Sequence, residues 1–247
     1  MPIVTKNLII INALIFLADT LLFRNGSLDS YLALHYFSSD HFMPHQIITC
    51  MFMHGSLSHL FFNMFAVFMF GRTLEMIWGP KKFLLYYMIA GIGASLLQLF
   101  VMYLRVSYIE ASIPPEQLPA VLSMIKTEGY NLLMNQKNYT DPAVGALNLL
   151  VNGGMVGASG AVFGILVAFG MIFPNSELFI IPFPFPIKAK WFVIGYGVLE
   201  LTLGIVDSPT DNVAHFAHLG GLFTGLILLL YWRKRGKLTT NDGSFQR

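Results

Sequence analysis

Six long apolar stretches constrain this chain more than any other feature of its sequence. They cover roughly residues 8–23, 47–71, 83–104, 151–173, 191–206 and 213–232, and the first and fifth are the shortest. About 20 mostly apolar residues can cross a bilayer as a helix, and only a helix satisfies its own backbone there at such lengths. The pattern therefore predicts an all-α membrane protein, a bundle of six transmembrane helices.

The composition supports a membrane protein and excludes several other classes. Hydrophobic residues make up 55% of the chain and charged residues only 11%, whereas a typical soluble domain is about 25% charged. The net charge of +2 is too small to predict a nucleic-acid partner. Cys50 is the single cysteine, so no disulfide within the chain is expected. Residues 1–6 precede an apolar run without a small-residue cleavage site, which favours a retained span.

The distribution of basic residues predicts the orientation of the spans. An even number of spans places both termini on one side, and that side carries eleven of the fifteen basic residues. These are Lys6, Arg72, Lys81, Lys82, Lys188, Lys190, Arg233, Lys234, Arg235, Lys237 and Arg247. The other side carries Arg24, Arg105, Lys126 and Lys137. Because cytoplasmic loops are enriched in lysine and arginine, we expect both termini to be cytoplasmic, in what we take to be a bacterial inner membrane.

The domain organisation is expected to be simple. Residues 1–237 would form one six-helix domain, followed by a short cytoplasmic tail at 238–247. A polar insertion at about 106–150 would lie on the outer face, with a short helix at 118–125 after two prolines.

Polar residues within the spans are costly and are therefore functional candidates. His59 and Asn63 lie four residues apart in the second span and share one helix face. Ser159 lies near the start of the fourth span, and His218 near the start of the sixth. Counting inward from the outer face at about 1.5 Å per residue places Ser159 about 6–12 Å deep, His218 about 8–10 Å and His59 about 10–18 Å. Similar depths on three helices indicate a shared, water-filled cavity.

These side chains have the chemistry of acyl transfer. A serine hydroxyl becomes a nucleophile when a base removes its proton, and histidine can serve as that base and then as the acid. His59 and Asn63 could donate hydrogen bonds to an oxyanion, together with the backbone N–H of Ser159. Gly157 and Gly160 flank Ser159 without side chains, which allows a substrate backbone and neighbouring helices to approach closely.

Each of these residues alone also fits a packing role. An intramembrane serine often bonds to its own helix, and Asn63, His215 and His218 could each join two helices. Small residues three or four apart, as at Gly157 and Gly160 and at Gly221 and Gly225, are common at helix contacts. A zinc site of His54, His59, His215 and His218 is a weaker alternative, because the sequence has no His-Glu-x-x-His run, and no metal or cofactor is expected. The combination at matched depth favours a catalytic site.

Three motifs in this order resemble the rhomboid family of intramembrane serine proteases, over roughly residues 44–232. They are His54-Gly-Ser-Leu-Ser-His59-Leu-Phe-Phe-Asn63, Gly157-Ala-Ser159-Gly160 and Ala217-His218-Leu-Gly-Gly221-Leu-Phe-Thr-Gly225. Each motif is weak alone, but all three on alternate spans are highly specific.

The resemblance implies a role for each matching residue. Ser159 would be the nucleophile, His218 the general base, and His59 and Asn63 the oxyanion hole. Gly221 would allow the sixth helix to approach the fourth. The family also implies a Ser–His dyad without a third, acidic member, and no Asp or Glu neighbours His218 in the sequence.

The sequence departs from the family pattern at two places and leaves two charged or titratable residues unassigned. Phe163 stands where the family often has a tyrosine that stacks on the catalytic histidine, and it should keep that stacking. His45-Gln46 replaces an outer-loop Trp-Arg pair. His215 matches no catalytic position and is expected to be structural, and Glu200 lies in the fifth span without an evident partner.

The chain is therefore expected to be an intramembrane serine endopeptidase that cleaves transmembrane proteins near the outer membrane face. The alternatives are an inactive rhomboid-like protein that binds membrane clients and, less favoured, a channel or transporter. The inner halves of the second, fourth and sixth spans are nearly all apolar, which argues against a path through the membrane.

Overall fold

A computed structural model describes residues 1–23, 27–179, 185–206, 214–236 and 238. The α-helices are α1 (Ile3–Leu22), α2 (Ser27–Leu32), α3 (Gln46–Thr49), α4 (Leu57–Ala66), α5 (Arg72–Trp78), α6 (Pro80–Ser112), α7 (Leu118–Met124), α8 (Tyr130–Met134), α9 (Pro142–Asn152), α10 (Ser159–Ile172), α11 (Ala189–Val206) and α12 (His215–Lys234). A 3₁₀ turn, η1 (Cys50–Phe52), follows α3, and the π-helical turns η2 (Val67–Gly71) and η3 (Ile125–Gly129) follow α4 and α7. The strands β1 (Glu177–Leu178) and β2 (Ile187–Lys188) form one short antiparallel pair.

Five helical segments among the described residues are long and apolar enough to cross a membrane. They are Ile3–Leu22, Leu57–Trp78, Pro80–Ser112, Ala189–Val206 and His215–Lys234. These segments confirm the predicted all-α membrane class. The fourth predicted span corresponds to α10, which has 14 residues and is shorter than the others. Val213, the predicted start of the sixth span, and most of the predicted tail lie outside the described residues.

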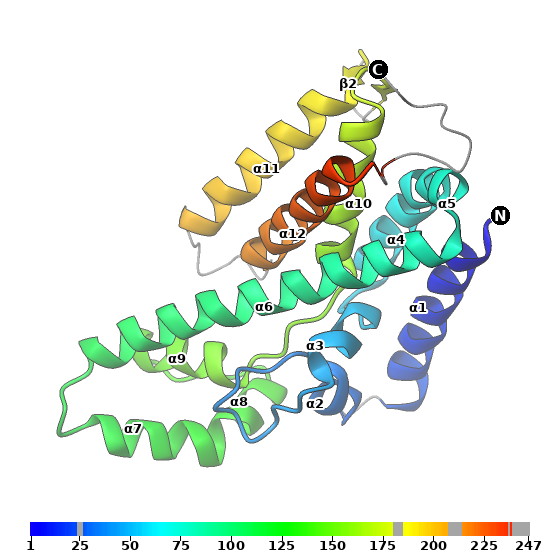
Figure 1. Cartoon of the computed structure of the whole chain (residues 1–247). Coiled ribbons are helices and arrows are strands. Elements are labelled where there is room, and N and C mark those ends of the chain that lie inside the picture. The colour runs from blue at the N-terminus through cyan, green and yellow to red at the C-terminus, as the bar shows by residue number, and fades with distance from the viewer. Residues whose placement is uncertain (24–26, 180–184, 207–213, 237, 239–247) are drawn as a thin grey trace.

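The core is formed by α6, α10 and α12, which pack against one another (Figure 1). The contact between α10 and α12 depends on small residues. A Cβ added to Gly221 of α12 would overlap the carbonyl oxygen of Gly160 on α10, so the two backbones touch. This contact confirms the expected close approach at Gly221. Helix α11 packs along α12 and α10, and α1 lies beside α4 and α5.

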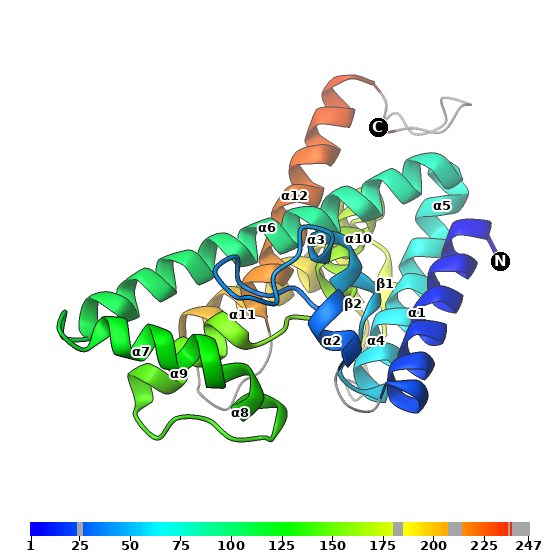
Figure 2. The same cartoon turned by 90° about the horizontal axis from the view of Figure 1, so that it is seen from below.

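The two ends of the bundle differ in content. The start of α1, the junction of α5 with α6, the β1–β2 pair and the end of α12 lie toward the upper right of Figure 1. Helices α2, α3 and α7–α9 lie toward the opposite end, where Figure 2 shows α7–α9 grouped beside α6. The predicted short helix at 118–125 is confirmed as α7. The predicted insertion at 106–150 begins inside α6, which continues to Ser112.

Two predicted span boundaries are wrong, for local reasons. The second span begins at Leu57 and not near residue 47, because Ser56 caps α4 by accepting a hydrogen bond from the His59 backbone N–H at 3.1 Å. The apolar residues before it form α3 and η1, whose Cys50 and Met51 are buried in the protein. In the fourth span, residues 153–158 are not helical, and α10 begins at Ser159. Depths counted by helical rise from residues 47 and 151 therefore do not apply.

Candidate active site

Ser159 is the first residue of α10, at the end of a non-helical segment. That segment is tied to its neighbours by backbone hydrogen bonds: Leu34 and Met155 exchange two at 2.9 Å, and the Gly157 N–H donates to the Cys50 carbonyl at 2.9 Å. Gly157 has φ +137°, a conformation that disfavours any side chain, and an added Cβ would lie 2.8 Å from the His59 ring. The glycine thus positions Ser159 beside His59.

Ser159 and His218 form a hydrogen-bonded pair across two helices. His218 lies in the first turns of α12, and its Nε2 is 2.7 Å from Ser159 Oγ. The Phe163 ring stacks on the His218 ring with centroids 4.5 Å apart and an interplanar angle of 11°. The structure thus brings together the two residues that the sequence predicted to react, and it places Phe163 where stacking was expected.

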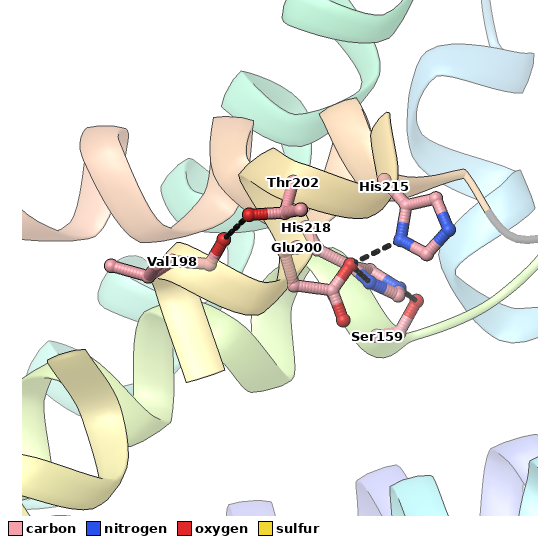
Figure 3. Close-up of polar contacts among 6 residues, drawn as sticks. All are labelled: Ser159, Val198, Glu200, Thr202, His215 and His218. Carbon is pink, nitrogen blue, oxygen red and sulfur yellow. Dashed lines mark hydrogen bonds and ion pairs between the residues drawn. The ribbon is translucent and has the colours of Figure 1, made fainter. Parts of the chain in front are cut away.

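The structure corrects one expectation about this pair, because His218 does have an acidic neighbour. Glu200 of α11 is only 3% exposed, and its Oε2 lies 2.8 Å from His218 Nδ1. The same oxygen lies 2.6 Å from Nδ1 of His215 (Figure 3). Glu200 comes from a different helix, which is why adjacency in the sequence missed it. A buried carboxylate in the middle of an apolar span was the available signal.

His59 and Asn63 lie on the α4 face that borders the site. The His59 ring lies against Gly157, where an added Cβ would be 2.8 Å from it. The Asn63 side chain is buried, and its Nδ2 donates to the His59 carbonyl of its own helix at 3.1 Å. This bond uses one of the two amide hydrogens, so the other remains for a further acceptor. Their assignment to an oxyanion hole stays a prediction.

The histidines singled out as a weaker zinc alternative do not all gather at one place. His54 contacts His59 ring to ring, at 5.0 Å between centroids. His215 and His218 instead group with Glu200, and the ligand atoms of these three residues lie within 4.8 Å of one another. Among the described residues, this triplet is the arrangement that could chemically hold a metal ion.

Comparison with known proteins agrees with the three motifs. The sequence profile of a family described as "Eukaryotic integral membrane protein (DUF1751)" matches residues 5–245. RHOMBOID-like protein 12, mitochondrial, of Arabidopsis thaliana is 26% identical over 193 residues, covering 77% of this chain and 47% of the relative. Rhomboid protease AarA of Providencia stuartii is 26% identical over 180 residues, covering 72% of this chain and 52% of the relative.

A third relative, Rhomboid protein 1, mitochondrial, of Saccharomyces cerevisiae, is 26% identical over 188 residues, covering 76% of this chain and 42% of the relative. The chain spans about half the length of the curated relatives it matches. These matches confirm the resemblance to rhomboid proteins.

Proposed function

Because this chain belongs to the DUF1751 family of integral membrane proteins and is rhomboid-like, we propose that it is an intramembrane serine endopeptidase. The observation that carries this proposal is the 2.7 Å hydrogen bond between Ser159 Oγ and His218 Nε2. A nucleophile and a base at this distance, with the base held by further contacts, form the arrangement that activates a serine. One relative is named a protease, which supports the same reaction.

The proposed reaction follows from the positions of the protons. Ser159 Oγ attacks the carbonyl carbon of a peptide bond and gives its proton to His218 Nε2, while the carbonyl π electrons move to the oxygen. When that tetrahedral intermediate collapses, the C–N bond breaks and His218 gives the proton to the leaving amine. Water then attacks the acyl-enzyme with His218 again as base, which releases a new carboxyl terminus and frees Ser159.

The oxyanion would be stabilised at the start of α10. Helix N-termini present backbone N–H groups without intrahelical partners, and the N-cap residue here, Ala158, has no side-chain acceptor to occupy them. We assign the Ser159 N–H, His59 and the second amide hydrogen of Asn63 as donors to this oxygen. Aimed donors of this kind contribute about 10²- to 10³-fold each to the rate.

The substrates would be transmembrane proteins, cut near the outer face of the membrane. Ser159 and His218 lie at the helix ends nearest α7–α9, opposite the basic junction of α5 with α6 (Figure 1). A substrate helix must unwind before its carbonyls can reach Ser159, so we expect cleavage near glycine, proline or other weak helix formers. The relatives come from mitochondria and from a bacterium, so the proposal does not specify which of these membranes holds the chain.

The decisive experiment measures cleavage of a fluorogenic transmembrane peptide by the purified full chain in proteoliposomes. Ser159→Ala and His218→Ala should each lower kcat by at least about 10³-fold. Ser58→Ala is a matched control, because this exposed serine bonds to Ser56 at the helix start and lies outside the pair. Wild-type activity in Ser159→Ala, or no cleavage by the wild type of any transmembrane peptide, would contradict the proposal.

A further inference from the structure

Glu200 sits at the centre of a buried polar chain that the two-residue mechanism does not use. We propose that Glu200 is a positioning residue that orients His218 and stabilises its protonated form, so that the site works as a Ser159–His218–Glu200 triad. The inference rests on the proposed protease function and deepens it. Figure 3 shows the chain of contacts from Ser159 through His218 to Glu200, with His215 contacting the same Glu200 oxygen as His218.

The first argument concerns the position of the proton on His218. An ionised carboxylate only accepts hydrogen bonds, so with Glu200 ionised, Nδ1 of His218 is the donor in the 2.8 Å contact. In a neutral imidazole the other nitrogen then carries a lone pair. That nitrogen, Nε2, is the one 2.7 Å from Ser159 Oγ, and it can therefore accept the serine proton. Glu200 thus selects the reactive tautomer.

The second argument concerns charge. When His218 takes the serine proton it becomes a cation in a largely buried site, where charge is costly. Glu200 lies in direct contact with the opposite ring nitrogen and offsets that cost, more strongly than it would in water. Glu200 orients the His218 ring and stabilises the His218 cation. Both effects act through His218, so Glu200 would contribute to catalysis without touching the substrate.

His215 supports this role by holding the carboxylate. Its Nδ1 lies 2.6 Å from the same Oε2 that His218 contacts. The two imidazoles approach Glu200 with centroids 6.3 Å apart and their planes at 90° to each other. Two donors on the same carboxylate oxygen hold the Glu200 side chain in one rotamer. They also provide the hydrogen bonds that a buried charge needs. Glu200 is therefore fixed before the substrate arrives.

The same three residues could be considered as ligands for a metal, but the distances favour hydrogen bonds. Ligands at about 2.0–2.1 Å from a tetrahedral zinc ion stand about 3.3 Å apart. The two nitrogen-to-oxygen distances here are 2.6 and 2.8 Å, the lengths of charge-assisted hydrogen bonds. A zinc ion bound to Nδ1 would also leave the proton on Nε2 and stop His218 from accepting one from Ser159.

The test compares Glu200→Gln with wild-type enzyme in the proteoliposome assay. Glutamine keeps the shape but loses the charge, so kcat should fall by about 10²- to 10⁴-fold, as for the acidic member of other triads. KM should stay within about twofold, because Glu200 does not contact the substrate. Thr202→Val is the matched control on the same helix: its exposed hydroxyl bonds to the Val198 carbonyl at 2.9 Å, and kcat should not change.

Two further measurements separate positioning from a structural role. In wild-type protein labelled with ¹⁵N-histidine, the Nδ1–H of His218 should give a far-downfield proton resonance, and Glu200→Gln should lose it. Glu200→Asp keeps a carboxylate and should recover at least about tenfold of the kcat lost in Glu200→Gln. If Glu200→Gln does not fold, Glu200→Asp still tests the proposal through this resonance.

The outcomes distinguish this inference from the protease proposal itself. If Ser159→Ala is inactive while folded Glu200→Gln keeps at least half of the wild-type kcat, the triad is wrong and the protease proposal stands. If Ser159→Ala is active, both are wrong. If a chelator abolishes wild-type activity and zinc restores it, the three residues form a metal site and the positioning role is overturned.

Discussion

At the scale of single residues, the sequence predicted the pair Ser159 and His218, which the structure brings into hydrogen-bond contact, but not the carboxylate that contacts His218. Ser159 and His218 could be predicted because each lies in a short motif and each is costly inside a membrane. Glu200 has the same cost, yet its partner could not be assigned, because α11 and α12 are separate helices and only their packing brings Glu200 to His218. Pairing between spans is information that hydropathy does not contain.

The stacked ring of Phe163 provides a test of how precisely His218 must be held. Phe163→Leu removes an aromatic pair worth about 0.5–1.5 kcal/mol, so we expect kcat to fall by about two- to twelve-fold. Phe163→Tyr keeps the stacking and should stay within about twofold of wild type. Steady-state cleavage of the transmembrane peptide measures both. Equal kcat for the leucine and tyrosine variants would show that the ring does not position His218.

At the scale of elements, hydropathy predicted where apolar segments lie but not where helices start. The segments before Leu57 and Ser159 are apolar, so a sliding average includes them in the spans. Ser56 caps the start of α4 and separates the first segment from that helix. In the second segment, Gly157 has φ +137°, which an α-helix does not contain. Both breaks lie beside the site, where the backbone departs from a regular helix to position Gly157 and Ser159.

The close contact between α10 and α12 predicts that adding a single methyl group at Gly221 destabilises the fold. Gly221→Ala places a methyl group against the Gly160 carbonyl, and overpacking of this kind costs about 1–3 kcal/mol. The unfolding temperature in detergent should therefore fall. Because Ser159 and His218 lie on these same two helices, the distance between them should also change. Gly195→Ala on α11 is the control, because an added Cβ there meets nothing within 4 Å and alanine favours a helix. Equal unfolding temperatures for the two variants would contradict the close packing.

The packing of the segment before α3, which contains His35, against α8 should weaken in acid. His35 is 1% exposed and lies beside His41 and Tyr130, and burial lowers the pKa of His35 from 6.5. The folded state therefore stays neutral while the unfolded state gains a proton, so stability is lost as the pH falls below 6.5 toward the lowered pKa. Leu34 and Met155 form a bridge between this segment and the non-helical segment before Ser159. Their amide exchange should speed up from about pH 7.5 to about pH 5 after correction for intrinsic rates.

His35→Gln provides the control for this acid effect. Glutamine can replace the ring donor that bonds the Ala33 carbonyl at 3.0 Å, but it does not titrate. Exchange at Leu34 and Met155 should then change less with pH than in the wild type. The same pH dependence in both proteins would assign the effect to another group, such as His41, whose pKa is also lowered by burial.

At the scale of the whole molecule, hydropathy predicted the class of the fold, and the sidedness that the basic residues indicate stays a prediction. The predicted cytoplasmic residues Lys6, Lys81 and Arg233 lie on α1, α6 and α12, whose ends that carry them gather at one end of the bundle. Lys126 lies in η3, between α7 and α8, which are at the other end (Figure 1). The count of crossing segments was less predictable, because α10 is short and is buried by its neighbours on most sides. An apolar helix inside protein and one facing lipid have similar hydropathy.

The orientation can be tested with single cysteines and a maleimide that does not cross membranes. Wild-type protein should give almost no signal, because Cys50 is 1% exposed and burial raises the pKa of its thiol to about 11, which keeps the reactive thiolate scarce. Lys137→Cys lies in the exposed segment after α8, and Lys81→Cys lies in the exposed first turn of α6. In intact cells Lys137→Cys should label and Lys81→Cys should not, and both should label after the membrane is permeabilised. The reverse pattern would place Ser159 and its neighbours near the cytoplasmic face, and with them the proposed cleavage site.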